Sequence, residues 1–270
     1  MQVNFVSRGL CVCFILLSGC QKDETSTNAI VDDTVTSDFS LISQLQDGEP
    51  VFGMFARPQN AEGGSIAGKN TGPDFIFYSL ESGPWDISSL EAFRMAMVTA
   101  SDHNIGHPIT LRIPPIRQDP EALDRYISEG LVEGVGGIVF PHVESSREAE
   151  LAVQALSDRA WPQNAEGDVI TIILIEDRIG VEVSEEIVAT PGLSVVIPGP
   201  GDLRRAYNGD SESVEAAIQR VLAACKDFQV PCGITAGIDD VVERLEQGFK
   251  MIIASDLATI ETGREFLRSF

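Results

Sequence analysis

Short hydrophobic runs alternate with longer amphipathic segments from about residue 50 to the end of the chain. Runs that are apolar at most positions are typical of strands buried on both faces, as in a parallel sheet. Eight runs are predicted as strands, at residues 51–55, 75–79, 109–113, 137–141, 169–175, 193–197, 232–235 and 251–255. The pattern therefore predicts a parallel sheet of eight strands.

The segments between these runs carry the start and stop signals of helices. Pro120 stands at a first helical position and Gly130 ends the same segment, an arrangement that the backbone preferences of the two residues favour. Ser145 and Glu148 form a capping box. A later segment carries an apolar stripe of Val214, Ile218, Val221, Leu222 and Cys225. Eight strands and intervening helices in roughly 220 residues predict a TIM (β/α)8 barrel, with an open doubly wound sheet as the alternative.

The first 20 residues have a different character. They contain one arginine, about ten apolar residues and the sequence LSGC, which ends at Cys20. The apolar stretch is too short to span a bilayer, so it predicts a signal peptide. LSGC resembles a bacterial lipobox, which predicts that Cys20 is lipidated and that the protein is anchored on the periplasmic side. Gln21 in the next position favours the outer membrane; an ordinary secretory signal or a buried strand is the alternative.

The segment that follows is polar, acidic and rich in serine and threonine, and it predicts a flexible tether over residues 21–45. The folded domain is expected to comprise residues 46–270. Two of its residues are thiols, Cys225 and Cys232, which fit either small buried apolar positions or a disulfide.

Charge restricts the partners. The formal net charge is −22, which argues against nucleic acid and against electrostatic binding to an anionic membrane. Membrane contact is therefore expected through the lipid anchor only. An anionic small molecule would need a local cation or a bound metal ion.

Candidate chemistry lies at the carboxyl ends of the predicted strands, where the active sites of TIM barrels are found. The residues in these positions are Glu81, Ser82, Arg112, His142, Glu176 and Asp202. A carboxylate directly after a buried strand is costly unless it is solvated, paired or bound to a cation. Glu176 and Asp202, from adjacent strand ends, could together bind Mg²⁺ or Mn²⁺ with water.

A structural explanation of the same residues is the more common one on spacing alone. In it Glu176 pairs with Arg178 or Arg112, and Asp202 caps a short helix. A buried Arg112 needs a carboxylate partner, from Glu81, from Glu176 or from a substrate. It can pair with the protein's carboxylate at rest and bind the substrate's carboxylate in the complex. The turn Gly199-Pro200-Gly201 lets the backbone approach a ligand closely.

Four segments carry a family resemblance that extends from about residue 50 to 263. They are DFIFYSLESGPWD, ITLRIPPIRQDPEALDRYISEGLVEGVGGIVFPHVESSREAELAV, IILIEDRIGVEVSEEIVATPGLSVVIPGPGDL and LEQGFKMIIASDL. In order and spacing they resemble the HpcH/HpaI aldolase and citrate lyase superfamily. The resemblance implies a TIM barrel, homo-oligomeric assembly, Glu176 and Asp202 as ligands of Mg²⁺ or Mn²⁺, and Arg112 as the group that holds a 2-oxo acid. It also implies carbon–carbon cleavage or addition through a metal-bound pyruvate enolate.

The chain departs from the family at the position of its proton-transfer pair. The family sequence Asp-Leu-Glu-His-Gly-Pro is replaced by SLESGP, so Ser82 stands for the histidine and Ser79 for the aspartate. A serine hydroxyl without an activator is not a base near pH 7. Glu81 keeps its family position. An impaired enzyme or a binding lipoprotein that retains the metal and oxo-acid pocket is therefore the alternative function, and a scaffold used only for interaction is a third.

Two further expectations concern the surroundings of the pocket. The segment 157–168 is short where the aldolases have a long covering loop, which predicts a more open pocket. His142 is the histidine nearest the predicted mouth. It is expected to pack against the following helix rather than to serve as a base, since nothing in the sequence places this single histidine within reach of a substrate proton.

Overall fold

The computed structural model describes residues 41–269. All eight predicted strands are present, three of them with the predicted bounds, and a ninth, β5, is a two-residue addition. The strands are β1 (Val51–Phe55), β2 (Phe75–Ser79), β3 (Ile109–Arg112), β4 (Val135–Phe140), β5 (Ala160–Trp161), β6 (Val169–Ile175), β7 (Val195–Pro198), β8 (Gly233–Ala236) and β9 (Met251–Ala254). Every ladder between them is parallel.

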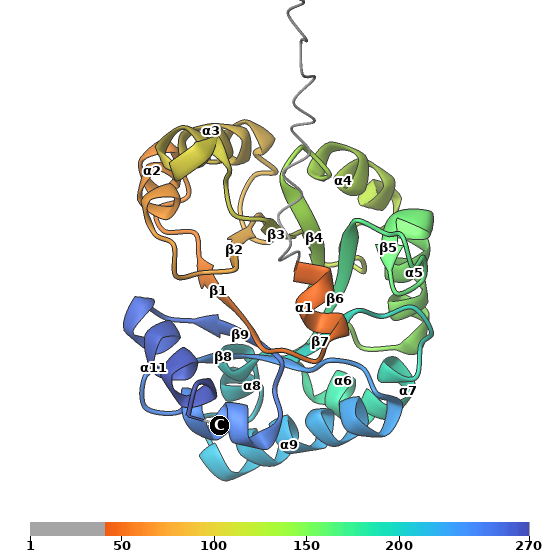
Figure 1. Ribbon diagram of the computed structural model, residues 1–270. Helices are drawn as coiled ribbons and strands as arrows, with labels where there is room; N and C mark the ends of the chain where they lie inside the picture. Colours follow the sequence, from red (N-terminus) through yellow and green to blue (C-terminus); the bar gives the residue numbers. More distant parts are fainter. Residues whose placement is uncertain (1–40, 270) are drawn as a thin grey trace, which may run out of the picture. The chain divides into compact units, whose positions relative to one another are not determined.

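Apart from α1, which precedes β1, the helices connect the strands and lie on the outer face of the sheet (Figure 1). They are α1 (Leu41–Gln46), α2 (Ala61–Lys69), α3 (Ile87–Ala100), α4 (Leu123–Gly130), α5 (Ser146–Leu156), α6 (Arg178–Glu182), α7 (Ser184–Val188), α8 (Pro200–Ala206), α9 (Ser211–Phe228), α10 (Val241–Gln247) and α11 (Leu257–Leu267). Ser145 caps α5, since its Oγ accepts a hydrogen bond from the Glu148 amide. The apolar stripe predicted after residue 211 is buried on α9.

The strand order shows how the sheet curls. It runs β6-β4-β3-β2-β1-β9-β8, with β5 and β7 both paired to β6. The first and last strands of the chain are neighbours, with Val51 in register with Met251, as in a TIM-barrel-like fold and unlike the reversing order of a doubly wound sheet. Between β7 and β8 there is one isolated parallel bridge, Val196 to Cys232, and the Val196 amide donates to Pro231 O at 3.1 Å.

Side chains on the inner face of the curled sheet form one buried cluster. Its strand members are Val51, Phe75, Phe77, Val139, Ile170, Ile172, Leu174, Val195, Ile197, Met251 and Ile253. The alternate residues on the same strands, such as Phe52 and Ile76, belong to a second cluster that includes residues of the surrounding helices. Burial on both faces explains why the strands are hydrophobic at successive positions.

Helix α1 extends the domain beyond its predicted start. Leu41 and Leu45 are 5% and 4% exposed and belong to the inner cluster, and α1 lies across the ring of strands in Figure 1. Residues 41–45, which the sequence composition places in the tether, are therefore part of the folded domain. The predicted signal peptide, Cys20 and the rest of the tether lie outside the described residues.

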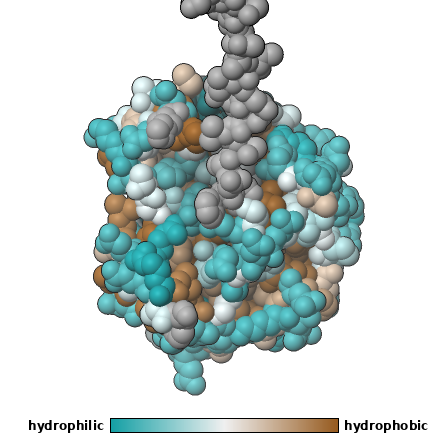
Figure 2. All heavy atoms as spheres, viewed as in Figure 1, coloured by the Kyte–Doolittle hydropathy of each residue, from teal (hydrophilic) through white to brown (hydrophobic). Residues whose placement is uncertain are grey.

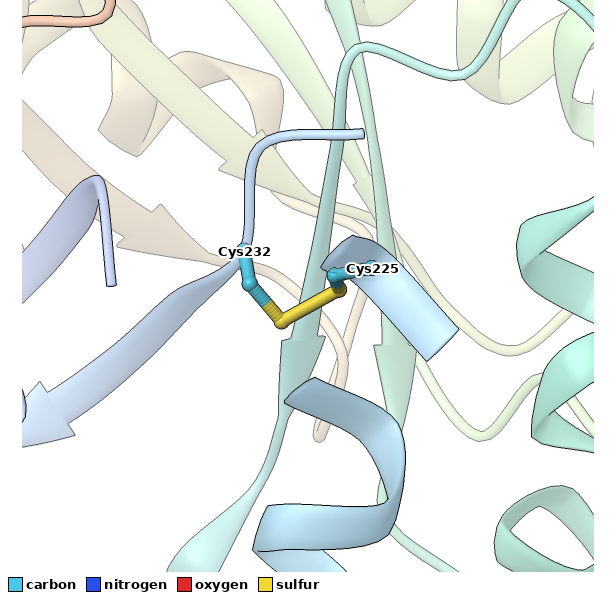
Figure 3. Close-up of a disulfide and its surroundings, with 2 residues drawn as sticks. All are labelled: Cys225 and Cys232. Atoms are coloured by element: carbon cyan, nitrogen blue, oxygen red, sulfur yellow. A yellow bond between two sulfur atoms is a disulfide. The ribbon is translucent and has the colours of Figure 1, made fainter. Parts of the chain in front are cut away.

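Cys225 and Cys232 form a disulfide that joins the last turn of α9 to the start of β8 (Figure 3). Both residues are almost fully buried. The disulfide and the buried positions, which the sequence offers as alternatives, therefore occur together. Cys232 also takes part in the isolated bridge to β7. The disulfide thus attaches α9 to the residue that bridges β7 and β8.

Polar residues dominate the face shown in Figure 2, with hydrophobic residues between them. Within residues 41–269, no helix combines the length and hydrophobicity needed to cross a bilayer.

Candidate active site

The carboxyl ends of the strands surround a pocket of about 300 Å³. Its lining combines apolar residues of the inner cluster with charged and glycine residues from the strand ends. The lining residues are Phe55, Arg57, Phe77, Arg112, Leu174, Glu176, Ile197, Gly199, Pro200, Gly201, Asp202, Thr235 and Ile253. Four positions singled out from the sequence, Arg112, Glu176, Asp202 and the Gly-Pro-Gly turn, therefore share one pocket.

Arg112 is the last residue of β3 and is fixed from two sides. Its Nη2 lies 2.9 Å from Glu81 Oε2, and its Nε donates to Ser79 Oγ at 2.9 Å. The guanidinium also lies over the Phe77 ring, 5.5 Å from the centroid. The predicted pairing with Glu81 is present, and Ser79 orients the arginine.

Glu176 follows β6 and is 2% exposed. Its Oε1 accepts a hydrogen bond from the His142 amide at 3.2 Å. Burial raises the pKa of the Glu176 carboxyl to about 7; His142 opposes the shift, and Asp202 adds to it. The expected pair with Arg178 is absent, because Arg178 donates to Ala206 O instead. Among residues 41–269, Glu176 is therefore a buried carboxylate without an arginine ion pair.

Glycine is required opposite this carboxylate. A Cβ on Gly199 would lie 2.5 Å from Glu176 Oε2, closer than any non-bonded contact allows. The absence of a side chain at Gly199 lets the turn into α8 pass beside Glu176. Asp202, in the first turn of α8, pairs with Arg205 of the same helix and makes no side-chain cap, which corrects the expectation that it caps the helix.

His142 occupies a different position from the one expected. Its ring does not simply pack against the following helix: Nδ1 lies 2.8 Å from Asp177 Oδ2, and Nε2 lies 3.3 Å from Glu81 Oε1 and 3.7 Å from Glu176 Oε1. The backbone of His142 is left-handed, with φ of 53°. This conformation is uncommon for a residue other than glycine, and spacing along the sequence does not reveal it.

The carboxylates around this imidazole control its charge. Glu81 beside it raises the pKa of His142 to about 9 against the opposing effect of burial, and Glu176 and Asp177 act in the same direction as Glu81. Burial would raise the pKa of Glu81, but His142 and Arg112 outweigh it, and the pKa lies below its usual value. The position of Nε2 therefore attracts positive charge.

The residues fit a divalent cation. One ligand atom from each of Glu81, His142 and Glu176 lies within 4.8 Å of the other two. Glu81 Oε1 is buried and lacks a hydrogen-bond partner among the described residues. Asp202 lines the same pocket as Glu176 and is close enough to raise its pKa. A cation would neutralise this surplus of carboxylates.

The two serines that replace the family pair do not form a new pair. Ser79 is engaged with Arg112, whereas Ser82 is exposed. Glu81 remains at the site through its contacts with Arg112 and His142.

The segment 157–168 cannot cover this pocket in its own chain. Its Ala160 pairs with Val169 at the start of β6, at the opposite end of the strands. Within one chain this segment therefore does not border the pocket, and the more open pocket expected from its short length stays a prediction. His107 lies at that end too, with Nε2 2.7 Å from Asn70 O.

Asp177 and Arg57 were not singled out from the sequence. Asp177 directly follows Glu176, and two successive carboxylates at a strand end were an available signal. Arg57 is exposed at the rim of the pocket and lies over the Phe55 ring, 5.1 Å from the centroid.

Known proteins share this sequence pattern and fold. The model of the family described as HpcH/HpaI aldolase/citrate lyase matches residues 52–259. A hydroxypyruvate/pyruvate aldolase of Paraburkholderia phytofirmans is 26% identical over 247 residues, which cover 80% of this chain and 91% of that protein. A 5-keto-4-deoxy-D-glucarate aldolase of Salmonella arizonae is 26% identical over 224 residues, 73% of this chain and 82% of that protein.

Solved structures agree in fold. An HpcH/HpaI aldolase/citrate lyase family protein from Burkholderia cenocepacia superposes with a TM-score of 0.65 at 22% identity, over 85% of this chain and 98% of that one. The citrate lyase beta subunit of M. tuberculosis, solved with oxaloacetate and magnesium, has a TM-score of 0.59 at 18% identity, over 83% and 99%. With the family match over residues 52–259, the chain belongs to the HpcH/HpaI aldolase/citrate lyase family.

Proposed function

We propose that the protein is a divalent-metal-dependent carbon–carbon lyase that acts on 2-oxo acids through a pyruvate enolate. The observation that carries the proposal is the shared pocket of Arg112, Glu176 and Asp202 at the strand ends. The aldolase names of the relatives, one of which includes pyruvate, support the reaction class and the substrate class.

Arg112 is the group that would hold the carboxylate of the oxo acid. Its Nε donates to Ser79 and its Nη2 pairs with Glu81. A guanidinium has five N–H groups, so others remain to donate to a substrate. The two contacts fix its orientation, so little side-chain entropy remains to be lost on binding. The Gly199-Pro200-Gly201 turn lets the substrate approach the backbone beside Glu176.

Glu176 and Asp202 would hold the divalent ion, with Mg²⁺ and Mn²⁺ as the candidates and water completing the shell. A bound ion supplies Lewis-acid charge that offsets the negative charge developing on the oxo-acid oxygen. Arg112 adds fixed positive charge near the same oxygens. The buried position of Glu176 keeps these interactions out of bulk water, where they would be weaker.

Enolate formation can be measured without knowing the second substrate. Purified full-length protein is incubated with pyruvate in D₂O, and loss of the methyl proton signal is followed by NMR with and without Mg²⁺ or Mn²⁺. We expect ion-dependent exchange above the rate of the ion in buffer. Absence of exchange with either ion, in protein shown to bind the ion, would reject the lyase.

A second candidate is a binding protein that retains the pocket but does not turn over. The arrangement of Ser79 and Ser82 favours it, because one serine orients Arg112 and the other is exposed. Neither is placed to transfer a proton.

Restoring the family pair separates these two candidates. If the absent pair limits the reaction, Ser79→Asp with Ser82→His should accelerate cleavage of a 4-hydroxy-2-oxo acid by about 10²-fold, the lower end of the effect of a positioned acid–base group. Ser82→His alone should gain less, since the aspartate fixes the imidazole tautomer. A folded, metal-binding double variant with no gain would show that another step is limiting. Ser88→Asp with Ser128→His, on exposed helical positions, is the control for added charge.

We also propose that the protein is anchored at the periplasmic side of a bacterial membrane through a lipid on Cys20. The buried disulfide supports an oxidising compartment. Cys20→Ala should yield an uncleaved precursor or a protein that leaves the membrane fraction. Normal processing with unchanged fractionation would contradict the anchor.

A further inference from the structure

His142 is held rigidly beside Glu176, which lines the pocket. Its amide donates to Glu176 Oε1 at 3.2 Å, and its carbonyl accepts from Arg117 Nη2. Its ring is fixed through Nδ1 by Asp177, at 2.8 Å. Backbone and ring are therefore both constrained, and the left-handed φ of 53° is maintained by these contacts. A strained residue held this firmly is typical of a functional site.

The free ring nitrogen faces two carboxylate oxygens. Nε2 lies 3.3 Å from Glu81 Oε1 and 3.7 Å from Glu176 Oε1. Around one ion with bonds of about 2.1 Å, neighbouring ligand atoms are about 3.0 Å apart in an octahedron and about 3.4 Å apart in a tetrahedron. The two separations from Nε2 are close to these values, and the two carboxylates lie within 4.8 Å of each other, so a shift of the carboxylates toward Nε2 would place all three atoms around one ion.

The contact on the opposite side of the ring suits the same role. When Asp177 accepts a hydrogen bond from Nδ1–H, the neutral imidazole presents its lone pair at Nε2. Histidines that bind metals commonly donate their other N–H to a carboxylate in this way, which fixes the tautomer and increases ligand basicity. Glu81 Oε2 is likewise oriented by Arg112, at 2.9 Å, while the buried Oε1 has, among the described residues, only the contact with His142 Nε2 at 3.3 Å.

The geometry points to Glu81, His142 and Glu176 as a three-ligand metal site that takes a transition-metal ion of the Mn²⁺, Co²⁺ or Zn²⁺ class in preference to Mg²⁺. The inference rests on the proposed function for the presence of a divalent ion in the pocket. It goes further by assigning a nitrogen ligand, His142, and a second glutamate, Glu81, beside Glu176. Imidazole favours transition metals, whereas Mg²⁺ favours an all-oxygen shell.

The competing explanation is an ion-pair cluster in which a protonated His142 neutralises Glu81, Glu176 and Asp177. Both explanations place positive charge at Nε2. They differ in whether an ion can replace the proton there and in whether its coordination then contains nitrogen.

Metal titration distinguishes them. Full-length protein is stripped with a chelator and titrated with Co²⁺, Zn²⁺ and Mg²⁺ separately by calorimetry, and the visible spectrum of bound Co²⁺ is recorded. His142→Asn removes the imidazole and retains a residue that tolerates the left-handed backbone. We expect it to weaken Co²⁺ and Zn²⁺ binding at least tenfold and to change the Co²⁺ spectrum, with Mg²⁺ binding within threefold of wild type.

Two further variants complete the test. Asp177→Asn keeps the ring but removes its carboxylate partner and should weaken Co²⁺ binding by about 10–100-fold. His107→Asn, at the opposite end of the strands, should leave binding and spectrum unchanged. Thermal unfolding without added ion identifies any variant that has lost its fold, and the other variant then decides the question.

Unchanged Co²⁺ affinity and spectrum in both His142→Asn and Asp177→Asn would overturn the inference. Loss of Co²⁺ binding in Asp202→Asn, with no loss in those two variants, would also overturn it. Pyruvate exchange with excess Mg²⁺ tests the proposed function separately. If pyruvate protons exchange but neither His142→Asn nor Asp177→Asn alters Co²⁺ binding, only the nitrogen ligand is rejected. If Co²⁺ binding depends on His142 but no ion supports pyruvate proton exchange, the lyase function is rejected and the three-ligand site stands.

Discussion

Glu176→Gln is expected to abolish the thermal stabilisation by Mn²⁺ and to reduce pyruvate exchange to background. In wild type, an ion at 100 times its Kd should stabilise the fold by about 2.7 kcal/mol, or about 5–10 °C in Tm for a domain of this size. A neutral amide is a poor ligand for a divalent ion, and Glu176 contributes to every ion position considered for this pocket. Differential scanning fluorimetry and the D₂O assay measure the two effects.

The same variant should be more stable than wild type without an ion. The folded carboxyl has a pKa of about 7 against 4.5 for an ordinary glutamate, so the folded protein binds this proton more tightly. The contribution of this carboxyl to wild-type stability should therefore be largest below pH 4.5 and should be lost as the pH rises through about 7. Glutamine avoids that loss, and urea unfolding at pH 8 with a chelator should show a gain of about 1–3 kcal/mol.

The matched control is Glu150→Gln, the same change on the exposed face of α5. It should alter neither the response to Mn²⁺ nor the exchange rate. A wild-type Tm that is independent of Mn²⁺, together with no bound metal by elemental analysis, would disprove the assignment of Glu176.

Arg112→Met is expected to raise the KM for a 2-oxo acid by about 10²-fold or more. The substitution removes a charge-assisted contact with the substrate carboxylate, which is worth about 1.5–3 kcal/mol or more when the site is desolvated. Arg112→Lys should be intermediate, because an ammonium keeps the charge but cannot donate in a planar, bidentate fashion. Steady-state kinetics or pyruvate titration by calorimetry provides the measurement.

Loss of the arginine also leaves Glu81 Oε2 without its partner, which should cost about 1–3 kcal/mol of stability. Arg112→Met with Glu81→Gln separates the two roles of the arginine. The second change should restore stability without restoring substrate affinity. Recovery of affinity in the double variant would show that Arg112 acts only through Glu81.

The strands were predictable because burial on both faces leaves a local signal. The run at 169–175 is hydrophobic throughout, and β6 has the predicted bounds. The positions of Arg112, Glu176 and Asp202 at one end of the sheet followed from the fold class, since strand ends in a parallel barrel point the same way. These features need no knowledge of individual side-chain conformations.

The placement of His142 was not predictable in this way. A left-handed backbone at one residue turns its ring toward Glu81 and Asp177, and contacts far apart in the sequence maintain that conformation. The start of the domain was missed because α1 is short, and its two buried leucines resemble occasional apolar residues of a tether. The disulfide likewise depends on the distance between α9 and β8, which two cysteines in a sequence do not reveal.

Helix α1 has a consequence for the order in which ligands come and go. Leu41, Leu45 and the inner cluster fill the inner face of the curled sheet on the side of α1, so residues 41–269 leave no passage along this face from that side. A substrate must then use the same mouth as the ion, and Glu176, at 2% exposure, lies deeper than Arg112 with a side chain 22% exposed. Under the proposed function, the kinetic mechanism is ordered: the ion enters before the oxo acid, and it leaves after the product.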